Sequence, residues 1–145
     1  MIAAIAKEVI SFEGRSCDEV IFHFVGNKKM CRLHADFFDD PSPTDCMSFP
    51  LDADRSSGYQ ILGEVFVCPQ TAANYIAKNG GYLDEEITLY TVHGLLHLLG
   101  YDDLNDKDRL IMRKKEEEHM SNLRKCGIIP ATQKQLKIQK SDRVE

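Results

Sequence analysis

A short segment of this chain holds residues whose types and spacing suit metal binding. His93 and His97 lie four positions apart in the stretch VHGLLHLLGYDD (92–103). On a helix, this spacing places two imidazole rings on one face, where they can bind the same ion. Gly100 permits a sharp reversal of the chain, which would bring Asp103 back over that face. We therefore predict a metal site formed by His93, His97 and Asp103, with an open position for water as in catalytic zinc sites.

Each of these residues also has a purely structural interpretation. Two histidines at this spacing can lie in a core or an interface without binding a metal. Asp103 can be a turn or capping residue, because Asp102 and Asp106 lie in the same turn-like sequence. Asp102 is the second candidate for the carboxylate ligand.

The spacing is also that of the zinc-protease pattern H-E-x-x-H-x-x-G-x-x-H. In that pattern the glutamate is the general base that activates water. Gly94 occupies the glutamate position, and Asp103 occupies the position of the third histidine. Because the base of proteolysis is missing, we expect the site to catalyse a different reaction.

The elements that would position these residues follow from hydrophobic periodicity and from punctuating Gly and Pro residues. Asn27 and Asp84 are expected to cap helices, Pro69 to open one, and Gly100 to end the helix with the histidines. The sequence predicts helices over 2–12, 27–38, 69–77, 84–99 and 106–125, and strands over 19–25, 46–51 and 60–68. This order indicates an α+β fold, a small mixed β-sheet packed against several helices. The metal site would lie on a helix and its following loop.

Length and composition point to one globular domain. The chain has 145 residues, 43% of them hydrophobic, which suits a single core. We assign residues 1–127 to this domain and 128–145 to a polar, flexible C-terminal tail. No stretch approaches the roughly 20 consecutive apolar residues of a membrane span. The five cysteines are scattered and no export signal is evident, which favours reduced thiols and a cytoplasmic location.

The charge balance limits the kinds of partner. A formal net charge of −5 argues against a surface that binds nucleic acid over its whole extent. A local basic patch around Lys28, Lys29 and Arg32 remains compatible with RNA binding. The same three residues would also suit a solvated helix face.

Three segments together resemble one protein family. The stretch HGLLHLLGYDD (93–103) resembles the H-G-x-L-H-L-x-G-Y-D-H signature of the YbeY family. PTDCMSFPL (43–51) is similar to the family segment T-D-V-L-S-F-P, and LGEVFVC (62–68) to its strand L-G-D-I-x-I-C. The matches span about residues 33–103 in the family's order.

The resemblance implies a function. YbeY proteins are single-domain, metal-dependent bacterial endoribonucleases with an α+β fold. The expected activity is zinc-dependent, single-strand-directed RNA cleavage in 16S ribosomal RNA 3′-end maturation and ribosome quality control, with one Zn²⁺ per chain. The expected partners are ribosomal RNA and the small ribosomal subunit, without a membrane. The alternative is a ribosome-associated assembly factor with a structural metal and little nuclease activity.

Two departures from the family pattern bear on mechanism. Asp103 stands where the signature has its third histidine. The family also has an L-N-x-x-Y-R segment, whereas LHADFF (33–38) places His34 at the asparagine and Phe38 at the arginine. A guanidinium there could bind a phosphate and stabilise its developing charge, which Phe38 cannot do. Phe37 and Phe38 could instead form the apolar end of a helix packed on the core.

A few other residues allow two interpretations. Thr44 and Ser48 either line the cleft near the metal or satisfy backbone groups. His119 lies in the charged stretch KKEEEHM, so we expect it on a solvated helix face. The sequence assigns no general base.

Overall fold

A three-stranded sheet forms the centre of the molecule. The computed structural model describes residues 1–42, 44–51 and 58–130. Its strands β1 (Glu19–Phe24), β2 (Cys46–Pro50) and β3 (Ile61–Val67) are ordered β1-β3-β2. Strand β1 runs parallel to β3, and β2 runs antiparallel to it. The sheet is therefore mixed, as predicted.

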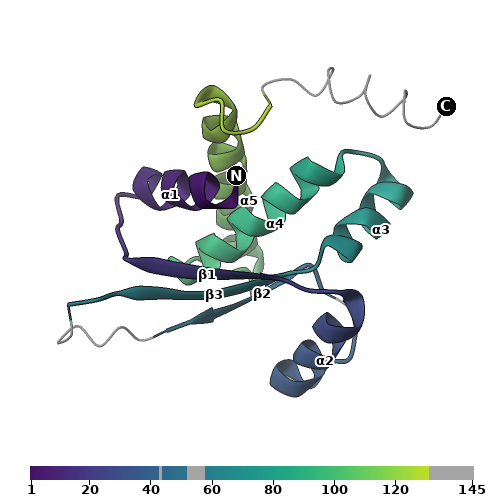
Figure 1. Ribbon diagram of the computed structural model, residues 1–145. Helices are drawn as coiled ribbons and strands as arrows, with labels where there is room; N and C mark the ends of the chain where they lie inside the picture. The colour runs from purple at the N-terminus through teal and green to yellow at the C-terminus, as the bar shows by residue number, and fades with distance from the viewer. Residues whose placement is uncertain (43, 52–57, 131–145) are drawn as a thin grey trace.

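The described residues form five helices, which lie on the two faces of the sheet. Figure 1 shows α1, α3, α4 and α5 on one side of the sheet and α2 on the other. Helix α4 is central, because it packs against β2, β3, α1, α3 and α5. The arrangement confirms the predicted α+β class. The helices are α1 (Ile2–Phe12), α2 (Asn27–Phe38), α3 (Pro69–Asn79), α4 (Leu83–Leu98) and α5 (Asp106–Lys125).

Helix α4 is buried on most of its surface, although it carries polar residues. Its buried side chains include Val92, Leu95 and Leu96. The hydroxyls of Thr88 and Thr91 are also buried and donate to the backbone carbonyls four residues earlier, at 2.7 and 2.9 Å. Because these hydroxyls find partners within the helix, they cost little to bury. A helix that is buried on most of its surface belongs in a core.

The core lies on both sides of α4. On one side, α1 and α5 pack against it, and on the other, the sheet does. Fully burying one large apolar side chain contributes roughly 1.5–3 kcal/mol, so the many contacts of α4 hold it firmly in place. The first cluster includes Ile5, Val9, Val92, Leu95, Leu96, Met112 and Leu123; the second includes Val65, Val67, Ala72, Tyr90 and Leu98.

Gly94 is the point of closest approach between α4 and the sheet. A Cβ atom at this position would lie 2.5 Å from Val65 Cγ1 and 3.3 Å from Ser48 Oγ. The Ser48 hydroxyl also donates a hydrogen bond to the Gly94 carbonyl oxygen, at 2.8 Å. A side chain as large as that of glutamate would therefore clash with Val65 at this position.

Two predicted helix caps were wrong. Gly26, not Asn27, precedes α2, and Tyr82 precedes α4. Asp84 instead lies in the first turn of α4, where its negative charge still interacts favourably with the helix dipole. Helix α4 ends at Leu98, and Gly100 has φ of +106°. This left-handed conformation confirms the predicted reversal after the histidine helix.

Some predictions fall outside the described residues. These are position 43, residues 52–57 of the predicted loop, and residues 131–145 of the predicted tail. Within the described part of that tail, Ile129 is buried and packs with Ile128 against the core of α1, α4 and α5. All five cysteines are free thiols. No helix in the described ranges is long and apolar enough to cross a membrane.

The close approach at Gly94 leads to a stability prediction. Gly94→Ala forces a methyl group into Val65, and overpacking of this kind costs about 1–3 kcal/mol. Alanine has a higher helix propensity than glycine, which offsets about 1 kcal/mol of that cost. Because the contact with Val65 Cγ1 at 2.5 Å is severe, we expect the upper end of the overpacking cost. The free energy of unfolding, measured by urea denaturation, should therefore fall by about 2 kcal/mol.

Ser121→Ala is the control, because Ser121 is exposed within α5 and an alanine there adds no new contact. It should unfold at nearly the same urea concentration as the wild type. A Gly94→Ala protein as stable as the control would show that α4 and β3 are not tightly packed there.

Candidate metal centre

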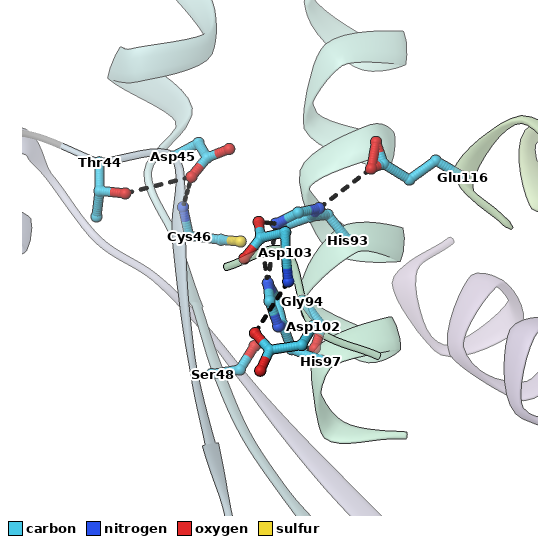
Figure 2. Close-up of polar contacts among 10 residues, drawn as sticks. All are labelled: Thr44, Asp45, Cys46, Ser48, His93, Gly94, His97, Asp102, Asp103 and Glu116. Carbon is cyan, nitrogen blue, oxygen red and sulfur yellow. Dashed lines mark hydrogen bonds and ion pairs between the residues drawn. The ribbon is translucent and has the colours of Figure 1, made fainter. Parts of the chain in front are cut away.

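The three predicted residues come together at the edge of α4. His93 and His97 lie on the helix, and Asp103 lies on the loop that follows it (Figure 2). The two Nε2 atoms are 3.1 Å apart, and Asp103 Oδ2 is 3.4 Å from His93 Nε2 and 3.6 Å from His97 Nε2. Their side chains are partly exposed, at 19%, 26% and 34% for His93, His97 and Asp103. Solvent can therefore reach the group.

Glu116 fixes the orientation of His93. His93 Nδ1 lies 3.2 Å from Glu116 Oε2, and Figure 2 shows this contact on the side of the ring away from Asp103. An ionised carboxylate can only accept a hydrogen bond, so Nδ1 carries the proton. Nε2 then presents its lone pair toward His97 and Asp103. Metal-binding histidines are commonly oriented by such a carboxylate.

The donor set fits a metal ion better than it fits direct hydrogen bonding. Two imidazole nitrogens and one carboxylate oxygen point at one another, and each offers a lone pair when its group is in its metal-binding form. Within the described ranges, these three residues make up the one group arranged to hold an ion, with ligand atoms within 4.8 Å of one another. Two histidines and one carboxylate form a known catalytic zinc set.

The electrostatics of the site favour a cation. Burial lowers the pKa of His93, but the hydrogen bond to Glu116 and the nearby carboxylates raise it above its usual value. These carboxylates include Asp45 and Asp103 as well as Glu116. The same negative potential that attracts a proton also attracts a metal ion.

The loop from Gly100 to Asp103 is shaped by local contacts. Asp102 Oδ1 accepts a hydrogen bond from the Asp103 backbone N–H at 2.9 Å. Asp102 is thus a turn residue, and it does not belong to the converging group. Of the two candidate carboxylates, the structure brings Asp103 to the histidines.

A polar contact from the far end of the sequence anchors this loop. The Tyr101 hydroxyl donates to Glu13 Oε1 at 2.6 Å, and His119 Nε2 lies 2.8 Å from Glu13 Oε2. Lys115 Nζ is 3.4 Å from the same Oε2 atom. The Glu13 side chain is only 8% exposed, so the contact is shielded from water. It ties the loop to α5 and to the residue after α1.

The prediction that His119 lies on a solvated face was wrong. His119 is fully buried, and Glu116 is nearly so. The buried apolar residues Met112, Met120 and Leu123 follow helical spacing on α5. That spacing places positions 116 and 119 on the same inward face. The signal was present in the sequence, but the surrounding charged residues obscured it.

A cleft of about 490 Å³ opens beside the three residues. Thr44 and Ser48 line it, as one of their two interpretations predicted, and both hydroxyls are also hydrogen-bonded. His34 and Phe38 line it from α2. Phe38 is 56% exposed and Phe37 is 62% exposed, so these rings are not the packed helix end that the sequence allowed.

The fold and this group of side chains define an α+β domain with a candidate metal centre. Residues 1–124 match the model of the family described as endoribonuclease YbeY. The chain therefore belongs to the YbeY family, whose members are metal-dependent RNA hydrolases.

Individual relatives agree with this assignment. The chain is 56% identical over 125 residues to an endoribonuclease YbeY from Protochlamydia amoebophila, covering 86% of this chain and 83% of the relative. It is 40% identical over 113 residues to that of Chlamydia abortus, covering 75% and 72%. A solution structure of a Thermotoga maritima protein matches with a TM-score of 0.60 and 25% identity, covering 83% of this chain and 77% of that one.

Removing the charge of Glu116 should weaken metal binding. In Glu116→Gln the shape of the side chain is kept, but the carboxylate that orients His93 is lost. Such changes typically lower metal affinity about 10- to 100-fold. Competition with a chromogenic chelator measures the affinity, and Glu117→Gln, on the exposed face of α5, is the control. Equal affinities for Glu116→Gln and the wild type would show that the negative charge of Glu116 does not contribute to metal binding.

The Glu13 contact should make stability depend on pH. Burial raises the pKa of Glu13, but hydrogen bonds from Tyr101 and His119 and the nearby positive charges lower it below its usual 4.5. A carboxyl with a lowered pKa stabilises the fold above its unfolded value, and the contribution is lost as pH falls through the folded value.

Glu13→Gln should therefore be less stable than the wild type at neutral pH. The difference should shrink as the pH falls below 4.5, as measured by urea denaturation across pH. Glu117→Gln should follow the wild-type curve. A Glu13→Gln deficit that is constant with pH would mean that the carboxylate charge has no part in it.

Proposed function

We propose that this chain is a zinc-dependent, single-strand-directed endoribonuclease. Its role would be 16S ribosomal RNA 3′-end maturation and ribosome quality control, with ribosomal RNA and the small ribosomal subunit as partners in the cytoplasm. The observation that carries the proposal is the convergence of His93, His97 and Asp103 at an open cleft. Family membership supports RNA as the substrate.

The ligand set supports zinc as the metal. Two imidazole nitrogens and one carboxylate leave a coordination position open, which distinguishes catalytic from structural zinc sites. A bound zinc ion would supply a Lewis acid that polarises a phosphoryl oxygen. His93 and His97 would hold the ion from a rigid helix, and Asp103 would reduce the positive charge of the site.

The chain's own residues prepare the site for this role. Glu116 keeps the proton of His93 on Nδ1, so Nε2 is available for the ion. Gly94 lets α4 approach the sheet, which places the histidines beside the cleft wall formed by β2. Tyr101 and Glu13 hold the loop that carries Asp103. Each contact reduces the reorganisation needed when the metal binds.

The second candidate is a ribosome-associated assembly factor with a structural metal and little nuclease activity. The observation in its favour is Phe38, which lines the cleft at the position of the family arginine. RNA cleavage by the wild type under zinc titration separates the two. Zinc-dependent cleavage supports the nuclease, whereas a zinc-loaded protein that leaves single-stranded ribosomal RNA intact supports the assembly factor.

His97→Ala tests the site itself. Two remaining ligands rarely hold zinc against competition, so zinc content should fall from about one per chain to a small fraction. Elemental analysis of the purified protein gives the zinc content, and an assay on a single-stranded ribosomal RNA fragment should show a parallel loss of cleavage. Full zinc occupancy in a His93→Ala/His97→Ala double variant would contradict the assignment.

Variants of Asp103 test the replaced ligand. Asp103→Ala should bind zinc more weakly than the wild type, because a charged ligand is lost, while Asp103→His restores a three-histidine set and should retain the metal. Chelator competition measures both affinities. If Asp103→Ala binds zinc as tightly as the wild type, Asp103 serves only the turn.

A further inference from the structure

The end of α2 presents a group of aromatic rings beside the cleft. Phe37 and Phe38 are 62% and 56% exposed, which is unusual for such large apolar side chains. The Phe38 ring lies 5.6 Å from that of His34, and the Phe37 ring lies 4.9 Å from that of Phe49. We call His34, Phe37, Phe38 and Phe49 the aromatic platform.

The platform is held in a fixed position. His34 Nδ1 is 2.8 Å from the Ser42 carbonyl oxygen, to which it donates. Phe49 packs edge-on against Phe66 of β3, with ring centroids 5.7 Å apart. Asp39 has φ of +55° and ends α2 directly after Phe38. The exposed rings are thus supported by the sheet through Phe49, and His34 is held by the segment that follows α2.

The platform is continuous with the candidate metal centre. His34 and Phe38 line the same cleft as His93, His97 and Asp103. A molecule that reaches the metal centre through this cleft therefore passes the exposed face of Phe38. This continuity points to the substrate, and not to an unrelated partner, as the occupant of the platform.

The described lining of the cleft lacks the positively charged side chains that usually bind RNA phosphates. The residues that the structure describes along the cleft include carboxylates, such as Asp45 and Asp102, but no Lys or Arg. A phosphate group of RNA in the cleft would therefore meet no positively charged side chain among these residues. Stacking on an aromatic side chain is the other common way to bind RNA, because every base has a π-face that can stack on Phe or His.

We propose that Phe38, supported by Phe37 and His34, stacks an unpaired base of the RNA at the entrance to the metal centre. The inference rests on the proposed function, in which RNA occupies the cleft. Bases within a duplex are already stacked on one another, so the platform selects single-stranded RNA. Stacking replaces the phosphate contact that Phe38 cannot make.

Positively charged side chains on α2 could bind the phosphates of the same RNA strand. Lys28, Lys29 and Arg32 are exposed on α2, outside the cleft. Within the described parts of the chain, no ion pair engages them. The predicted basic patch therefore begins in the first turn of the helix that carries Phe37 and Phe38 at its end. Single-stranded RNA is commonly bound by stacked bases together with cations along its backbone.

The chain contains no tryptophan, which makes a direct test possible. Phe38→Trp keeps an aromatic face and adds a single fluorophore at the platform. The zinc-loaded variant is titrated with a short 2′-O-methyl oligoadenylate and, separately, with an abasic oligomer of the same length. Stacking should quench the tryptophan fluorescence with the first oligomer and not with the second. Phe24→Trp, at an exposed site outside the cleft, should show no quenching with either.

Affinity measurements on Phe38→Ala complete the test. Loss of one stacked base should weaken binding of the oligoadenylate roughly 5- to 100-fold. The salt dependence of binding should not change, because no phosphate contact is lost. Phe38→Tyr should restore most of the affinity, and thermal melting shows whether each variant is folded.

Three results would overturn the inference: equal binding of the abasic and base-bearing oligomers, no quenching in Phe38→Trp, or wild-type affinity in a folded Phe38→Ala protein. The last would show that the Phe38 ring does not contribute to RNA binding. Failure of the proposed function looks different, because the zinc-loaded wild type would then not cleave RNA at all. Wild-type cleavage that persists unchanged in Phe38→Ala removes the stacking role alone.

Discussion

At Gly94, α4 lies so close to β3 that a single added methyl group would come within 2.5 Å of Val65 Cγ1. The residue before this contact is His93, and His97 follows one turn later, so the depth of α4 against the sheet sets where both imidazoles emerge. Packing on α1 and α5 holds the other side of the helix. Because the candidate metal centre is built on a helix with many buried residues, packing fixes where its two histidines lie.

Polar contacts from segments distant in the sequence also help to position the residues of the candidate metal centre. Glu116 on α5 orients His93, and Glu13 holds Tyr101 in the loop that carries Asp103. Both carboxylates are nearly buried, and both have partners, which keeps the cost of burying them low. The metal centre thus depends on α1, α4 and α5 together. The cleft beside it depends on β2 and on α2, whose Phe38 presents an exposed apolar ring to it.

The local part of this arrangement could be predicted from the sequence. The candidate site was predictable because His93, His97, Gly100 and Asp103 lie within one helix and the turn that follows it. Most element boundaries could also be predicted, from hydrophobic periodicity. Glu13 could not be predicted, because it meets Tyr101 across 88 positions through tertiary packing. The sequence left the exposure of Phe38 open for a different reason: apolar residues at a helix end often pack inward, and nothing local shows that α2 stops beside a cleft.

The central claim is that His93, His97 and Asp103 hold one zinc ion. Crystals of the zinc-loaded protein, measured at the zinc absorption edge, test it most directly. The account predicts one anomalous peak bonded to Nε2 of both histidines and to the Asp103 carboxylate, at about 2.0–2.2 Å from each, with a fourth position open to solvent. A peak elsewhere in the molecule, or one at the histidines with Asp103 turned away and Asp102 in its place, would contradict it.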